Sequence, residues 1–98
     1  MRIISRKSLK EFWERYPDAE PSLTKWYKVA QGAKWESLQD VRMTFSSADM
    51  VKTGNGKNVL VFNIGGNNYR LIAAKSGNIL FILHVLTHKE YDTDKWKR

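Results

Sequence analysis

The stretch that decides the fold reads NVLVFNIGGNNYRLIAAKSGNILFILHVL and spans residues 58–86. Two turn signals, Gly65-Gly66-Asn67 and Ser76-Gly77-Asn78, divide it into three segments rich in Val, Ile, Leu and Phe. Connections this short join only antiparallel neighbours, so the pattern predicts a meander of strands. A third turn signal, Thr53-Gly54-Asn55-Gly56, adds one strand on the N-terminal side. The predicted strands are residues 49–52, 58–64, 68–75 and 79–86.

Working toward the N-terminus, a first helix is predicted from four large apolar residues at helical spacing. They are Leu9, Phe12, Trp13 and Tyr16. The spacing i, i+3, i+4, i+7 makes one helical face apolar. Ser8-Leu9-Lys10-Glu11 fits a capping box at the helix start, with Ser5 as a competing N-cap. Pro17 is expected to end the helix, because the residue before a proline avoids the α region.

A second helix is predicted between Pro21, which suits a first helical turn, and Gly32, which suits a C-terminus. The apolar residues that share its face are Leu23, Trp26, Tyr27 and Ala30. Only a few residues separate the two helices, which favours an antiparallel helical hairpin. Residues 2–4 are expected to form a first or edge strand, and residues 37–41 one helical turn.

Together these elements predict an α+β fold. The helical hairpin packs on one face of an antiparallel sheet, the other face is open, and residues 89–98 form a short C-terminal tail or helix. The length fits one domain, residues 1–98. The absence of cysteine excludes disulfides and thiolate metal sites. No signal-like or membrane-spanning apolar run occurs, so we expect a cytoplasmic protein without membrane attachment.

Charge is distributed unevenly along the chain, whose formal net charge is +7. No carboxylate occurs between Asp49 and Glu90, although the same segment carries five basic residues: Lys52, Lys57, Arg70, Lys75 and Lys89. An unopposed positive field attracts phosphate groups. RNA is the simplest polyanion to cut without a metal or a pair of carboxylates, because its 2′-hydroxyl supplies the nucleophile.

Arg70 lies in the middle of a predicted strand. Period-2 alternation places it on one face with Ile72, and places Tyr69 and Leu71 on the other. One interpretation is a solvent-facing arginine on the open side of the sheet. The other is a guanidinium fork that binds a scissile phosphate, since this group is permanently charged and bidentate.

His88 is the better candidate of the two histidines for proton transfer. It lies beside Lys89 and Tyr91 at a strand end, and imidazole exchanges protons near neutral pH. Two histidines without cysteine make a poor metal site, and His84 is interpreted as a packing or surface residue. Tyr91 is a candidate for base stacking or for proton transfer through its phenol, or else covers the sheet edge.

Two segments carry a family resemblance: Asn67-Asn68-Tyr69-Arg70-Leu71-Ile72 and Thr87-His88-Lys89-Glu90-Tyr91-Asp92. They resemble the HigB family, the toxins of bacterial type II toxin–antitoxin modules within the RelE-like mRNA endonucleases. The resemblance implies a RelE-like fold and a ribosome-dependent mRNA endonuclease without cofactor or metal. Its implied partners are a HigA-type helix-turn-helix antitoxin, the ribosome and mRNA, with operator DNA reached only through the antitoxin.

The resemblance also implies roles for individual residues. Arg70 would stabilise charge on the phosphorane-like transition state, His88 would act as general acid or base, and Tyr91 would orient the RNA or share in proton transfer. Candidate RNA-binding residues are Lys52, Lys57, Asn63, Lys89 and Lys95. Some RelE-like proteins have lysines in the strand before the arginine, but residues 59–63 here contain none, which leaves the acid and base roles open.

Two other functions remain compatible with the sequence. A non-catalytic RNA-binding module would use the basic open face with Tyr69 or Tyr91 as stacking platforms, and would bind RNA without producing new ends. A purely protein-interacting subunit would explain the exposed aromatic residues but would leave the carboxylate-free segment unexplained.

Overall fold

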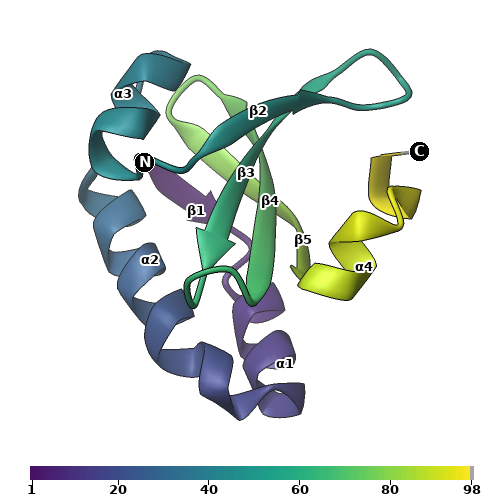
Figure 1. Cartoon of the computed structure of the whole chain (residues 1–98). Coiled ribbons are helices and arrows are strands. Elements are labelled where there is room, and N and C mark those ends of the chain that lie inside the picture. The colour runs from purple at the N-terminus through teal and green to yellow at the C-terminus, as the bar shows by residue number, and fades with distance from the viewer. Residues whose placement is uncertain (98) are drawn as a thin grey trace.

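A five-stranded sheet in the order β1-β5-β4-β3-β2 forms the centre of the molecule (Figure 1). The computed structural model describes residues 1–97. The strands are β1 (Arg2–Ile4), β2 (Asp49–Lys52), β3 (Asn58–Ile64), β4 (Tyr69–Ser76) and β5 (Ile79–Thr87). Strands β2 to β5 form the predicted antiparallel meander, whereas β1 lies parallel to β5. The predicted strand limits are correct to within one residue.

The turns follow the glycine pattern in the sequence. Gly65 and Gly66, between β3 and β4, have φ of 60° and 69°, and Gly77, between β4 and β5, has φ of 57°. These left-handed values strain any residue with a Cβ, so glycine determines where the chain reverses. The short β3–β4 turn also fixes the register that pairs Asn63 with Arg70.

The helical elements are α1 (Lys7–Arg15), η1 (Pro17–Ala19), α2 (Glu20–Gly32), α3 (Leu38–Thr44), α4 (His88–Asp92) and η2 (Lys95–Lys97). Helices α1 and α2 form the predicted hairpin on one face of the sheet (Figure 1). Trp26, Phe62 and Leu71 are fully buried between these layers. None of the helices within residues 1–97 is long and apolar enough to cross a membrane.

Two local predictions for the helices were wrong. Helix α1 has Arg6 at its N-cap and no side-chain cap, because β1 leads so directly into the helix that Ser8 already lies inside it. The Ser5 and Ser8 hydroxyls instead contact each other at 3.3 Å. Helix α3 is longer than the predicted single turn, and the Ser37 side chain caps it by accepting from the Asp40 backbone N–H at 3.3 Å.

The second face of the sheet is only partly open, which corrects the prediction. The C-terminal segment (α4 and η2) folds back against it, on the side away from α1 and α2 (Figure 1). A second apolar cluster forms there from Val59, Val61 and Ile72, with Leu86, Tyr91 and Trp96 packed against it. Arg98, the last residue of the predicted tail, lies outside the described residues.

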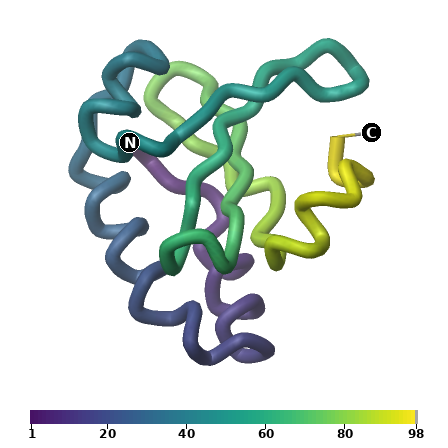
Figure 2. The backbone as a smooth tube through the Cα atoms, viewed as in Figure 1, coloured from purple at the N-terminus to yellow at the C-terminus, as the bar shows by residue number. Residues whose placement is uncertain are grey.

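The C-terminal segment is also tied to the β2–β3 hairpin. The Gly54 backbone N–H at the hairpin tip donates to the Lys97 carbonyl at 2.5 Å. Figure 2 shows the hairpin tip on the same side of the molecule as the C-terminal segment. The sheet therefore has a large helical layer on one face and a small C-terminal cover on the other.

Candidate active site

Arg70 is the buried centre of the candidate site, near the start of β4. Its side chain is only 8% exposed. Nη1 donates to the carbonyl oxygens of Asn67 and Tyr69, both at 3.1 Å, and Nη2 donates to the Asn67 side-chain oxygen at 2.6 Å. The predicted face is correct. Of the two interpretations of Arg70, the solvent-facing arginine was wrong, because α4 covers this end of the face.

The buried guanidinium of Arg70 has no carboxylate partner among residues 1–97. Its partners are two carbonyls, one amide oxygen, one imidazole nitrogen and the Tyr91 ring, and none of the ion pairs in this part of the chain includes it. Burial of a cation without an opposite charge is costly. Such a group strongly favours a bound anion, and its fork fits a phosphate.

His88 contacts Arg70 from the first position of α4. Its Nδ1 lies 3.3 Å from Arg70 Nη2, and its Nε2 lies 3.3 Å from the Asp92 Oδ2. The His88 backbone N–H donates to the Asn68 carbonyl at 3.0 Å, which fastens α4 to the β3–β4 turn. The imidazole is half-exposed, so one side of the Arg70–His88 pair remains accessible.

Local sequence explains why His88 lies there. Register pairs Tyr69 with Thr87 and Arg70 with Leu86, so β5 ends beside the start of β4. A capping box then starts α4 at once: the Thr87 hydroxyl accepts from the Glu90 backbone N–H at 3.1 Å, and the Glu90 carboxylate accepts from the Thr87 backbone N–H at 3.0 Å. The turn from strand to helix directs His88 toward Arg70.

Tyr91 completes the cluster. The Arg70 guanidinium lies 5.3 Å from the centre of its ring, within cation–π range. The ring also stacks on Trp96, with a centroid distance of 5.1 Å and an interplanar angle of 17°. Trp96 Nε1 donates to the Tyr91 carbonyl at 2.9 Å. Part of the Tyr91 ring is thus occupied within the protein, which favours a role for its phenol over base stacking.

Tyr69, the other predicted stacking platform, lies on the helical side of the sheet, so that prediction was wrong. It is buried against Phe12 and Tyr16, and its hydroxyl donates to Asp18 at 2.6 Å. This hydrogen bond, reinforced by burial, raises the pKa of Tyr69 to about 12. Tyr69 is therefore a structural residue that joins the sheet to the helices.

The other predicted residues fall into two groups. Asn63 is exposed and pairs directly with Arg70, so it shares that face, and Lys89 is exposed on α4 next to His88. Lys52, Lys57 and Lys95 are exposed near the linked hairpin tip and C-terminal segment. No contact joins this second group to Arg70 among the described residues.

His84 lies apart from the cluster. A bulge leaves Leu83 without a partner on β4, and β5 ends at Thr87, so the strand does not run unbroken from His84 to His88. His84 is exposed and borders a shallow groove beside α1. The interpretation of His84 as a packing or surface residue fits this position.

Two residues of the cluster were missed from the sequence. Asn67 accepts from Arg70 through both its carbonyl and its side chain, and Asp92 faces His88. Each carries a readable signal. Asn67 is a turn residue three positions before the arginine, and Asp92 stands four positions after the histidine, on the same side of a helix.

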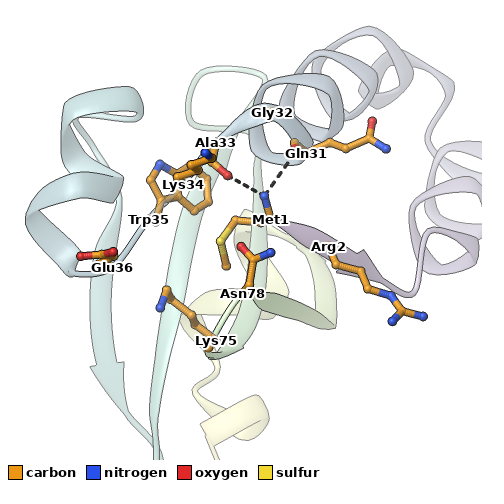
Figure 3. A pocket seen from close by; sticks show the side chains of 11 residues that line it. Met1, Arg2, Gln31, Gly32, Ala33, Lys34, Trp35, Glu36, Lys75 and Asn78 are labelled. Carbon is orange, nitrogen blue, oxygen red and sulfur yellow. Dashed lines mark hydrogen bonds between the residues drawn. The ribbon is translucent and has the colours of Figure 1, made fainter.

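A hollow of about 980 Å³ is lined by residues from β1, the end of α2 and the β4–β5 turn (Figure 3). It lies at the other end of β4 from Arg70. The α-ammonium group of Met1 borders it and donates to the carbonyls of Gln31, at 3.1 Å, and Ala33, at 2.5 Å. Lys75 and Asn78 line the opposite wall. Lys75, one of the basic residues of the carboxylate-free segment, lines this hollow, but Arg70, His88 and Tyr91 do not. The candidate chemistry is therefore at the other end of the sheet.

Comparison with known proteins agrees with this geometry. Residues 19–94 match the family model for HigB_toxin, a RelE-like toxic component of a toxin–antitoxin system. The mRNA interferase HigB of Escherichia coli O6:H1 (strain CFT073) is 32% identical over 94 residues, covering 94% of this chain and 89% of the relative. The mRNA interferase toxin HigB of Escherichia coli K12 is 31% identical, covering 94% and 88%. The chain therefore belongs to the HigB family of RelE-like toxins of toxin–antitoxin systems.

Proposed function

We propose that this protein is an mRNA interferase that cuts ribosome-bound mRNA without a metal ion. The observation that carries the proposal is the buried Arg70 guanidinium, which has no counter-charge and lies in contact with His88 and Tyr91. The relatives named mRNA interferase support it, since they align with nearly the whole chain.

The proposed reaction starts from attack of the 2′-hydroxyl on the adjacent phosphate and leaves a 2′,3′-cyclic phosphate and a 5′-hydroxyl. Arg70 binds the phosphate and stabilises the charge that develops on it. A phosphate oxygen is a stronger acceptor than the neutral oxygens of Asn67, an exposed turn residue, so it can replace them on the guanidinium. His88 transfers a proton, and Tyr91 orients the RNA or shares in proton transfer.

The remaining candidates would hold the RNA backbone. Asn63 and Lys89 stand next to the cluster, and Lys52, Lys57 and Lys95 extend the positive surface toward the hairpin tip. Such a small catalytic set gains most from a substrate that arrives already positioned, which supports a requirement for the ribosome. The proposed site of action is the cytoplasm, where ribosomes translate mRNA.

A toxin of this family acts together with an antitoxin. We propose a HigA-type helix-turn-helix protein as that antitoxin. It would keep the toxin inactive, and operator DNA would be contacted only through it.

The test of the function is substitution of Arg70. We expect Arg70→Ala to lower cleavage of ribosome-bound mRNA by on the order of 10²-fold or more, as when another preorganised transition-state donor is removed. Arg70→Lys is also expected to be impaired, because an ammonium cannot present the fork. Arg15→Ala, which removes an exposed arginine from α1, is the matched control and is expected to behave like the wild type.

The readout is mapping of new RNA 5′ ends, together with growth after induction. A folded Arg70→Ala variant that cuts at the wild-type rate would contradict the assignment of Arg70. Salt-sensitive RNA binding by the wild type without any new ends would contradict an enzyme altogether and favour a binding module. Base stacking by such a module is disfavoured, since Tyr69 is buried and Tyr91 already stacks on Trp96.

A further inference from the structure

The contacts of His88 determine which of its ring nitrogens carries the proton. Arg70 Nη2 lies 3.3 Å from His88 Nδ1. A guanidinium has only N–H donors, so Nδ1 must present its lone pair to it. In the neutral imidazole, the single proton is then on Nε2, the nitrogen that faces Asp92.

Asp92 is the only carboxylate among residues 1–97 that forms an ion-pair contact with His88. Its Oδ2 lies 3.3 Å from Nε2, at the i+4 position of the same helix. The negative charge of Asp92 stabilises a proton on His88 Nε2. This holds for the neutral imidazole and for the protonated imidazolium. A carboxylate behind a histidine commonly fixes the tautomer and stabilises the cation formed in catalysis.

The opposite side of the ring faces the proposed phosphate site. Nδ1 contacts Arg70 Nη2, which also donates to the Asn67 side-chain oxygen. A phosphate oxygen that accepts from Arg70 Nη2 replaces His88 Nδ1 as its partner. The Nδ1 lone pair is then free, at the place where the 2′-hydroxyl would bind. A nitrogen with a free lone pair there can take a proton but has none to give.

We infer that Asp92 is a positioning residue that holds His88 as the Nε2–H tautomer, so that His88 is the general base and acts through Nδ1. This inference rests on the proposed function and assigns the proton transfer that the sequence left open. The 2′-hydroxyl proton moves to Nδ1 while the 2′-oxygen forms its bond to phosphorus. The bond from phosphorus to the 5′-oxygen breaks, water protonates the leaving oxygen, and the imidazolium returns its proton to solvent. Asp92 neither takes nor gives a proton in this scheme.

The tautomer is measurable without any RNA. The chain contains only two histidines, so nitrogen-15 labelling of histidine gives two rings, and His84→Gln identifies the His88 signals. At a pH where the ring is neutral, we expect His88 to carry its proton on Nε2. Asp92→Ala is expected to shift His88 toward a mixture of tautomers, and Asp92→Asn to restore Nε2–H through its amide oxygen. Asp94→Asn is the matched control, because Asp94 pairs with Lys97 rather than with His88.

A second experiment separates base from acid. A 5′-bridging sulfur in the mRNA leaves without protonation, so it removes the need for a general acid. We expect His88→Gln to remain slow by about 10²-fold or more on the sulfur substrate, as it is on the natural one. Asp92→Ala is expected to be slower by roughly 10–100-fold on both substrates, as for other residues that orient a functional histidine.

Three outcomes would overturn the inference: a proton on Nδ1 in the wild type, an Asp92→Ala tautomer identical to the wild type, or sulfur substitution that restores His88→Gln to the wild-type rate. Failure of the proposed function looks different. In that case the wild-type chain produces no new RNA ends. The tautomer measurement needs no RNA, so it still reports whether Asp92 holds the proton of His88 on Nε2.

Discussion

The phenol of Tyr69 joins the sheet to the helical layer through one hydrogen bond. It donates to Asp18 at 2.6 Å, and this bond, with burial, raises the pKa of Tyr69 to about 12. We predict that Tyr69→Phe lowers the free energy of unfolding by about 1.5–3 kcal/mol at neutral pH, the usual net value of a hydrogen bond to a charged group. Urea unfolding measures the change.

The pH dependence of this contribution has a definite sign. The folded-state pKa of Tyr69, about 12, lies above the ordinary value of 10.0, so the folded protein holds the phenolic proton more tightly. The contribution is complete below about pH 10 and is lost as the pH rises toward 12. The wild type should therefore lose more stability than Tyr69→Phe over that window. Tyr27→Phe, which removes a different phenol, is the control. Equal losses of stability at alkaline pH in the wild type, Tyr69→Phe and Tyr27→Phe would refute the prediction.

Neighbouring residues show what sequence can predict at this scale. Alternation correctly placed Arg70 and Tyr69 on opposite faces. It said nothing of what covers each face, because the cover comes from distant positions: Asp18 lies 51 residues before Tyr69, and His88 lies 18 residues after Arg70. Exposure of a strand residue is a property of the tertiary structure, so this part of the prediction failed.

Among the elements, α4 connects stability to the site most directly, because it begins at His88 and contains Tyr91. We predict that Thr87→Ala, which removes the capping box, costs about 1 kcal/mol of stability and also slows mRNA cleavage. The reason is that fraying of a helix this short moves both candidate side chains away from Arg70. Single-turnover cleavage on ribosomes and urea unfolding give the two measurements.

The matched control for α4 is Ser37→Ala, which removes the N-cap of α3, away from the site. It is expected to cost a similar amount of stability and to leave cleavage unchanged. Equal loss of activity in both variants would mean that general stability, rather than the geometry of α4, limits the reaction.

Element boundaries were predicted best where glycine fixes them. The strands between the three turns were right to within one residue, because Gly65, Gly66 and Gly77 adopt left-handed conformations that other residues resist. Capping signals were less reliable: Ser37 and Thr87 cap real helices, whereas Ser8 does not. A capping pattern indicates a helix start only where the residue before it has a non-helical backbone. Arg6 and Lys7, which precede Ser8, are already helical.

At the scale of the whole molecule, the polar C-terminal segment (α4 and η2) covers part of the second face of the sheet. Its two aromatic residues, Tyr91 and Trp96, complete the second apolar cluster, and Lys97 meets the hairpin tip. This packing was not predictable from composition, because one tryptophan among charged residues carries no periodicity. The hollow bordered by Met1 and Lys75 is a poor guide to the site, since the candidate chemistry lies at the opposite end of β4.

The proposed metal independence concerns the whole molecule. The described residues bring no three His, Asp or Glu side chains together as a metal site, and the proposed nucleophile is the 2′-hydroxyl of the RNA itself. We predict equal single-turnover cleavage when Mg²⁺ around intact ribosomes is replaced by cobalt hexammine, which cannot coordinate protein ligands directly. Ribosome integrity is checked by sedimentation. Activity that returns with only one divalent ion would argue for a metal-dependent reaction.

The positive surface predicts how the protein reaches its substrate. The chain carries a net charge of +7, and Lys57 is exposed on the β2–β3 hairpin, away from the candidate cluster of Arg70, His88 and Tyr91. A residue that contacts phosphates only through charge changes affinity and salt dependence but not the chemical step. We therefore predict that Lys57→Glu weakens ribosome binding and reduces its salt dependence, while single-turnover cleavage at saturating toxin stays at the wild-type rate.

The matched control is Lys10→Glu, which makes the same charge reversal on the exposed side of α1. If the positive surface acts only through net charge, both variants weaken binding equally, because each lowers the charge of the chain by the same amount. If the hairpin and the C-terminal segment form the RNA-binding side, Lys57→Glu alone has a large effect. We expect the second result, because the hairpin lies in the part of the chain that has no carboxylates, whereas Lys10 adjoins Glu11 and Glu14.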